Sequence, residues 1–329
     1  MATEHDAVSA GLQRLAGRLG WPAPMGLRRL SGGASQETWS FDAGDRRLIL
    51  RRGPGGAPVK TSTQGIGLAT EAAVIQAARA AGTPAPEVVS VLAEEDGLGP
   101  GYVMARLEGE TLARRIQRDE AFAPARQRFA ADCGAAAAAI HATPLETLPA
   151  LPEADAATQL DLYEAAYRGY GGGRPAFELG FAALRRRLPP PIPARLAHGD
   201  FRLGNLMIQP NGLAAVLDWE LAHRGDPAAD LGWICTPSWR FGAIDMPVGG
   251  IADVDAMLEA YWGAGGDRLV TAERVRFWTI FGSLKWGVMC LTMAHVFDSG
   301  ADPSVERAAI GRRASETELD VLLMLKGLL

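Results

Sequence analysis

Apolar and polar residues alternate over short stretches in the first third of the chain. An opening helix comes first, over 8–19, where Leu12, Leu15 and Leu19 recur at helical spacing. The stretches that follow have the period of two that strands show. We expect strands at 26–30, 38–42, 47–51, 88–92 and 101–107. One longer helix, at 68–81, separates the third of these strands from the fourth.

From Gly109 onward the apolar positions follow helical spacing. Helices are expected at 111–117, 129–141, 159–170, 177–187 and 277–297. The last segment is long and apolar, but Lys285 and His295 interrupt it, which favours a buried helix over a membrane span. The sequence therefore predicts an α+β fold with two lobes. These are a small, mostly antiparallel β lobe with one main helix (1–107) and a larger helical lobe (108–329).

Composition narrows the possible classes of protein. The 329 residues are 48% apolar and carry a formal net charge of −5. No block of Lys and Arg stands out, which argues against a nucleic-acid surface. Cys133, Cys235 and Cys290 lie far apart and are odd in number, which favours neither a metal site nor a disulfide framework. The start of the chain lacks the basic region of a signal peptide. We expect a cytoplasmic protein without a membrane partner, either a monomer or a homodimer.

The strongest chemical signal lies at 198–205, which reads His-Gly-Asp-Phe-Arg-Leu-Gly-Asn. This segment has His, one residue, Asp, four residues and then Asn. The catalytic loop of kinases has the same spacing, with an Arg where Gly199 stands here. A predicted hairpin follows, with a Pro-Asn-Gly turn, so its ends at Asn205 and Asp218 should lie side by side. Their oxygens suit Mg²⁺ that carries nucleotide phosphates. The alternative is that His198 and Asp200 only fix a loop by hydrogen bonds.

With these motifs the chain resembles the aminoglycoside phosphotransferase family, relatives of choline kinase and of protein kinases. The resemblance covers nearly the whole chain and implies a kinase-like fold that uses ATP or GTP with Mg²⁺. It implies that Asp200 acts on the substrate hydroxyl, and that Asn205 and Asp218 hold the metal. It also implies that His198 is structural and that Asp230 braces the catalytic loop.

The resemblance also suggests where phosphates bind. Paired glycines, Gly32 and Gly33, followed by Ser35, lie between two predicted strands and offer backbone N–H groups. A simple hairpin turn is the other explanation of these glycines. Arg51 occupies the place of the usual phosphate-binding Lys, and strand alternation allows only one of Arg51 and Arg52 to point inward.

Four further residues complete the predicted site, each with an alternative. Glu71 is either the ion-pair partner of Arg51 or a solvated acid at a helix start. Met104 either lines the base pocket or belongs to the core. Ala105 and Leu107 lie where the family's hinge binds the base through backbone groups. Arg202 either stabilises the transferring phosphoryl group or lies on an exposed loop.

The function expected is therefore transfer of a phosphoryl group to a hydroxyl of a small molecule. The alternatives are a nucleotide-binding pseudokinase and an antibiotic phosphotransferase. The predicted helix at 277–297 offers no acid for a polycationic aminoglycoside. The motifs look closer to kinase-like domains joined to acyl-CoA dehydrogenases, which favours an uncharged or anionic acceptor with apolar character, such as a hydroxyacyl compound.

Overall fold

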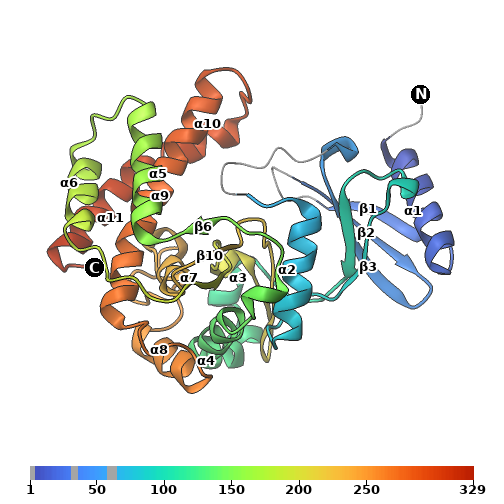
Figure 1. Cartoon of the computed structure of the whole chain (residues 1–329), viewed down its shortest axis with the longest axis horizontal. Helices are drawn as coiled ribbons and strands as arrows, with labels where there is room; N and C mark the ends of the chain where they lie inside the picture. The colour runs from blue at the N-terminus through green and yellow to red at the C-terminus, as the bar shows by residue number, and fades with distance from the viewer. Residues whose placement is uncertain (1–3, 31–35, 58–64) are drawn as a thin grey trace.

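The computed structural model describes residues 4–30, 36–57 and 65–329. A strand-rich lobe and a larger helical lobe lie side by side, with helix α2 (Leu68–Ala80) between them (Figure 1). The predicted α+β, two-lobed fold is confirmed. The predicted boundary after residue 107 stays a prediction. The last strand of the small lobe ends at Ala105, and the first helix of the large lobe begins at Ala113.

The small lobe is a five-stranded antiparallel sheet in the order β1-β2-β3-β5-β4. The strands are β1 (Met25–Leu30), β2 (Glu37–Ala43), β3 (Arg46–Arg52), β4 (Val88–Val91) and β5 (Gly101–Ala105). Helix α1 (Glu4–Leu19) packs Leu12 and Leu15 against one face of the sheet, and α2 covers part of the other. Residues on β3 alternate between these faces, so Leu50 faces α1 while Ile49 and Arg51 face the second lobe.

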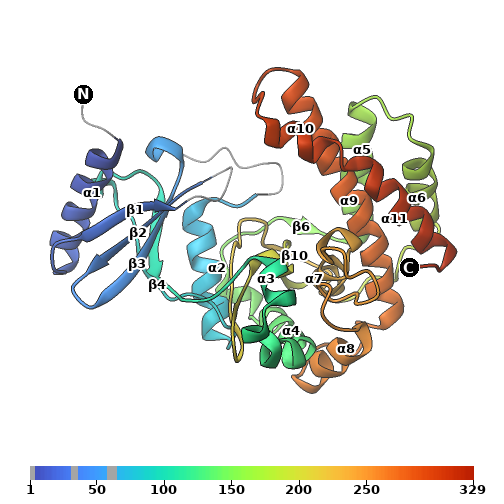
Figure 2. The same ribbon diagram turned by 180° about the vertical axis from the view of Figure 1, so that it is seen from behind.

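The large lobe is built around α9 (Ala272–Asp298), which is 27 residues long. The helices packed against it are α5 (Ala156–Gly169), α6 (Pro175–Arg185), α7 (Ala228–Ile234), α8 (Val254–Gly263), α10 (Val305–Gly311) and α11 (Ala314–Lys326). Figure 2 shows α11 beside α9 on the side away from the sheet, whereas α10 lies at the top of the large lobe on the side nearer the sheet. By length and composition α9 could cross a membrane, yet it buries side chains along most of its course, in agreement with the predicted buried helix.

The large lobe also contains two further α-helices and two small sheets. Helices α3 (Ala113–Arg118) and α4 (Ala123–His141) follow β5. Two small sheets follow: the hairpin β8 (Leu206–Gln209) with β9 (Gly212–Val216), and the sheet β6-β10-β7. The strands of the second sheet are β6 (Glu153–Ala154), β7 (Arg195–Ala197) and β10 (His223–Gly225).

Several of these elements were not predicted. Strands β6, β7 and β10 have at most three residues, too few to show a period. Helices α8, α10 and α11 were also missed, and α4 begins six residues before the predicted start at Phe129.

Candidate active site

The loop at 198–205 leaves β7 and is held from beneath by Asp230 of α7. The Asp230 carboxylate accepts hydrogen bonds from the backbone N–H groups of His198 (2.7 Å) and Gly199 (2.9 Å). His141 Nε2 lies 3.2 Å from Asp230 Oδ2. Burial pushes the pKa of Asp230 upward, but the hydrogen bonds and positive partners outweigh it and lower the pKa to about 2. A permanently charged acid therefore fixes the backbone of the loop.

Gly199 is required for the shape of this loop. Its φ of 83° lies in the left-handed region that favours glycine. A Cβ atom here would lie 2.2 Å from the carbonyl oxygen of Leu221. Leu221, three residues after Asp218, therefore packs directly against Gly199, the residue before Asp200.

The carboxylate of Asp200 is surrounded by three side-chain donors. Trp233 Nε1–H donates to Oδ1 at 2.6 Å, and Asn205 Nδ2 donates to Oδ2 at 2.6 Å. Arg202 Nε lies 3.1 Å from Oδ1, and its guanidinium stacks 4.8 Å from the centre of the Trp239 ring. Arg202 is therefore not a free surface residue. No sequence pattern points to Trp233, because the contact depends on how α7 packs beneath the loop.

His198 has both ring nitrogens engaged. Nε2 lies 3.0 Å from the carbonyl oxygen of Leu217, and Nδ1 accepts the backbone N–H of Asp200 at 3.2 Å. Burial lowers the pKa of His198, which favours the neutral ring that this pattern requires. The ring ties the loop to the hairpin.

The hairpin brings Asn205 and Asp218 together, as its predicted register requires. The backbone N–H of Leu217 donates to the carbonyl oxygen of Asn205 at 2.8 Å. Asp218 has φ of 66°, a left-handed conformation that an Asp adopts at a local cost of about 1 kcal/mol or more. Burial raises the pKa of Asp218, but the Arg51 guanidinium outweighs it, so the pKa lies below its usual value.

The donor set fits Mg²⁺ bound together with phosphates. Asn205 uses its amide nitrogen on Asp200, which leaves its oxygen to face a metal beside the Asp218 carboxylate. Among the described residues no group of three or more His, Cys, Asp or Glu side chains could hold a metal. Mg²⁺ commonly takes one or two protein oxygens and completes its shell with water and phosphate.

A cavity of about 290 Å³ opens between the lobes beside this pair. Its walls are largely apolar, and Arg51 and Asp218 lie among its lining residues. Met104, Ala105 and Leu107 all line it. The backbone N–H groups of Ala105 and Arg106 already donate hydrogen bonds to the carbonyl oxygens of Glu87 and Arg47. Leu107 therefore offers the next backbone N–H that could bind a base.

Arg51 connects the two lobes. Its Nη2 donates to Asp218 Oδ1 at 2.8 Å, its Nε donates to Gln36 Oε1 at 2.8 Å, and Glu71 lies 3.6 Å away. Gln36 also donates to Glu220 Oε2 at 3.1 Å. Arg52 points to the opposite face of the sheet and pairs with Glu37 at 2.8 Å.

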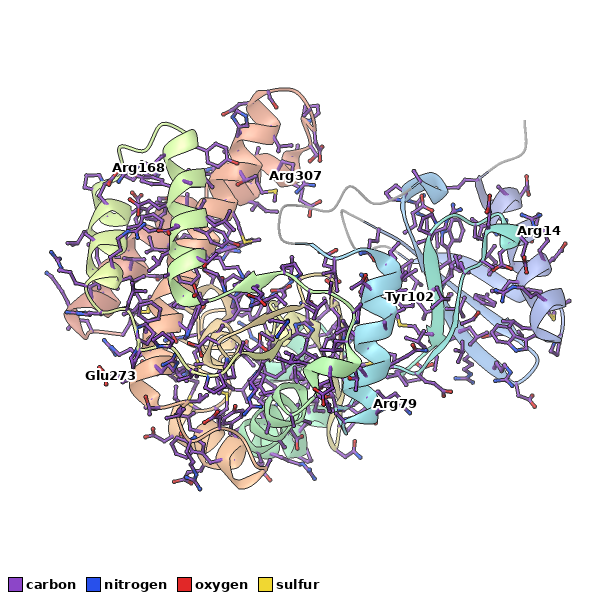
Figure 3. The ribbon with its side chains drawn as sticks, viewed as in Figure 1. Arg14, Arg79, Tyr102, Arg168, Glu273 and Arg307 are labelled. Carbon is purple, nitrogen blue, oxygen red and sulfur yellow. The ribbon has the colours of Figure 1, made fainter. Side chains whose placement is uncertain are left out.

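Glu71 is fully buried, so the alternative of a solvated acid at a helix start was wrong. It accepts a hydrogen bond from the hydroxyl of Tyr102, the residue labelled in Figure 3 where the sheet meets α2. Burial raises the pKa of Glu71, and Arg51 opposes that rise. The predicted phosphate-binding residues Gly32, Gly33 and Ser35 lie outside the described residues.

Lys285 was considered in the sequence only as an interruption of an apolar helix. In the structure it is buried on α9, and its Nζ lies 3.4 Å from the carbonyl oxygen of Gly199. A lysine in the middle of the largely apolar segment 277–294 was the signal that could have placed it near a site, because a buried charge needs a partner.

The fold and this arrangement of residues define a two-lobed phosphotransferase of the kinase type. The chain belongs to the phosphotransferase enzyme family, whose sequence pattern matches residues 26–278. The expectation of an enzyme that phosphorylates an alcohol group is confirmed at this level.

Known proteins similar to the chain agree with this class. Acyl-CoA dehydrogenase family member 10 of Mus musculus is 29% identical over 249 residues, which cover 71% of this chain but 22% of that protein. A solved structure from Ralstonia eutropha, assigned as an aminoglycoside phosphotransferase, has a TM-score of 0.72 at 20% identity, covering 96% and 98% of the two chains. An aminoglycoside phosphotransferase mutant in complex with AMP-PNP and hygromycin B has a TM-score of 0.59 at 19% identity, covering 94% and 98%.

The role of Asp230 gives a prediction about stability. Asp230→Asn places an amide where two backbone N–H groups need acceptors, so the free energy of unfolding at pH 7 should fall by about 3 kcal/mol. The folded-state pKa of about 2 lies below the value in the unfolded chain. The charge of Asp230 therefore stabilises the fold above about pH 4, and this contribution is lost as the pH falls through the folded-state pKa.

Urea unfolding from pH 7 down to pH 3 measures this effect. The control is Asp161→Asn, whose side chain is 67% exposed and which should change the stability by less than about 0.5 kcal/mol. A loss for Asp230→Asn that does not diminish at low pH would contradict the role of the charge.

Proposed function

We propose that this protein transfers the γ-phosphoryl group of ATP or GTP to a hydroxyl group of a small molecule in the cytoplasm. The observation that carries the proposal is the convergence of Asp200, Asn205 and Asp218 next to the interlobe cavity. Phosphoryl transfer needs alignment of the reactants and neutralised charge more than covalent chemistry by the protein. These three residues and Arg51 provide the groups for both.

On the acceptor side, Asp200 orients the hydroxyl and receives its proton. The hydroxyl oxygen forms a bond to the γ-phosphorus, the bond from that phosphorus to the bridging oxygen breaks, and the nucleoside diphosphate leaves. Trp233 and Asn205 support this role, because their hydrogen bonds hold the two carboxylate oxygens in place. Arg202, beside the same carboxylate, is positioned to balance charge on the transferring group.

On the nucleotide side, Arg51 anchors the phosphates and the cavity receives the base. Asn205 and Asp218 hold Mg²⁺, which neutralises phosphate charge when it is bound. In this structure Arg51 donates a hydrogen bond to Asp218. A bound phosphate would replace Asp218 as the acceptor of the guanidinium. The buried Glu71 and Gln36 keep the side chain in place for this exchange. Met104, Ala105 and Leu107 contact the base. Gly32, Gly33 and Ser35 remain predicted phosphate contacts.

The acceptor we favour is a hydroxylated compound of apolar character, such as a hydroxyacyl compound. A row of indole rings leads away from Asp200: Trp233, then Trp239 at 5.2 Å and Trp286 at 4.9 Å between ring centres. Trp233 and Trp239 are largely buried, so they make the surroundings of Asp200 apolar, which suits an acceptor of apolar character. The similarity to an acyl-CoA dehydrogenase family member supports an acyl substrate.

An antibiotic phosphotransferase is the second candidate, because structures of aminoglycoside phosphotransferases share the fold. Polycationic substrates need carboxylates, yet α9 carries Lys285 and no acid between Phe277 and Phe297. Efficient phosphorylation of kanamycin-type compounds by the purified protein, together with resistance of cells that express it, would favour this candidate over ours.

The role of Asp200 is tested by Asp200→Asn. Removing the group that takes the proton should lower kcat by about a hundredfold to ten-thousandfold and leave the Kd for nucleotide nearly unchanged. Steady-state kinetics with labelled nucleotide and calorimetric titration of the nucleotide give the two quantities. Near-full turnover in the variant would show that Asp200 is not the catalytic residue.

The two neighbouring arginines allow a matched test of the phosphate anchor. Arg51→Lys should raise the KM for nucleotide about tenfold, because an ammonium group does not reproduce the two-pronged contact of a guanidinium. Arg52→Lys makes the same chemical change one residue later, on the opposite face of the sheet, and should leave that KM unchanged. An equal effect of both substitutions, or a larger one at Arg52, would move the anchor away from Arg51.

A further inference from the structure

Lys285 is a buried cation that pairs with no carboxylate in the part of the chain that the structure describes. Its side chain is 7% exposed, and among the described residues no Asp or Glu lies within ion-pair distance of its Nζ. Its surroundings are the carbonyl oxygen of Gly199 at 3.4 Å and the rings of Trp233 and Tyr163, centred at 4.6 and 5.9 Å. The chain has three lysines among 33 basic residues, and this is the one on α9.

These contacts leave the ammonium group poorly compensated. It can donate three hydrogen bonds, and one long bond to a carbonyl together with two ring faces replaces little of its hydration. Burial lowers the pKa of Lys285, and the more distant charges of Asp200 and Asp230 oppose part of that effect. An uncompensated buried charge is costly, so an anion next to it would be strongly favoured.

A cavity of about 220 Å³ provides the space for such an anion. Lys285, Gly199, His223 and Gln159 are among the residues that line it. His223 directs Nδ1 to the carbonyl oxygen of Leu221 at 3.0 Å, while its buried Nε2 has no hydrogen-bond partner. Burial lowers the pKa of His223, and with Nδ1–H directed to Leu221 the neutral ring presents a lone pair at Nε2. Nε2 donates to an anion beside Lys285 only when the ring is protonated.

The acid at the rim of this cavity does not neutralise Lys285. Among the described lining residues Glu153 is the acidic one, but its side chain is 77% exposed and pairs with Arg224 at 3.5 Å. The nucleotide cavity is separate, because it is lined by Arg51 and Asp218 and shares no residue with this one. A ligand bound here therefore lies outside the nucleotide cavity.

We propose that this cavity binds a carboxylate group of the phosphate acceptor, with Lys285 as the residue that recognises it. Gly199 lines the cavity and immediately precedes Asp200, which does not itself line it. An acceptor that meets both Lys285 and Asp200 therefore carries its hydroxyl at a distance from its carboxylate, separated by a stretch of chain. The acceptor class is then a hydroxycarboxylate. This inference rests on the proposed function for the reaction, but the carboxylate site can be tested by binding alone.

The test compares straight-chain hydroxycarboxylates of increasing length with the carboxamide of each. For the wild-type protein, kcat/KM for the acid that reacts best should exceed that for its amide by at least about tenfold, the loss expected when one charge-assisted hydrogen bond is removed. Lys285→Met should abolish this preference and leave the KM for nucleotide unchanged. Lys285→Arg should restore part of it, and Lys326→Met, at an exposed lysine on α11, should retain all of it.

Thermal-shift titrations with the same acids and amides, without nucleotide, give a second readout. Stabilisation by the acids that disappears in Lys285→Met supports the site even if no phosphate is transferred, in which case the proposed function alone fails. The inference is overturned if the wild-type protein does not distinguish acid from amide in either assay. It is equally overturned if Lys285→Met keeps the wild-type preference.

Discussion

The buried carboxylate of Asp230 is the fixed point on which the geometry of the active site depends. It accepts two consecutive backbone N–H groups of the catalytic loop, and it is held in turn by His141. Because the loop backbone is fixed there, Asp200 emerges at a set position, where Trp233 from the same helix can reach it. One buried acid therefore fixes the loop, the Asp200 carboxylate and its indole donor relative to one another.

A second network, centred on Arg51, joins the lobes through charge. The arginine meets Asp218 of the large lobe, while Gln36 connects it to Glu220. In this state a residue proposed to bind phosphate and a residue proposed to bind metal satisfy each other. Arrival of a phosphate and a cation would exchange these contacts without leaving either charge unpaired, which keeps the cost of binding low.

Much of this could be predicted from the sequence because it depends on local patterns. The hairpin after Asn205 follows from its turn residues, and the two-lobed fold follows from the change in hydrophobic period. Strand alternation predicted that one of Arg51 and Arg52 points inward but did not identify which one. The neighbours of Glu71 and Lys285 could not be predicted, because burial next to Tyr102 or Gly199 arises only when distant segments pack together.

Transfer of phosphate to a small hydroxylated molecule can be followed by ³¹P NMR of the purified protein with ATP, Mg²⁺ and a set of hydroxylated acids. The γ-phosphate signal should decay while a new phosphate monoester appears in equal amount, and chelation of Mg²⁺ should stop both changes. Release of inorganic phosphate alone would show that the protein is not a phosphotransferase towards these acceptors. Nucleotide that binds and stays intact with every acceptor would indicate a pseudokinase.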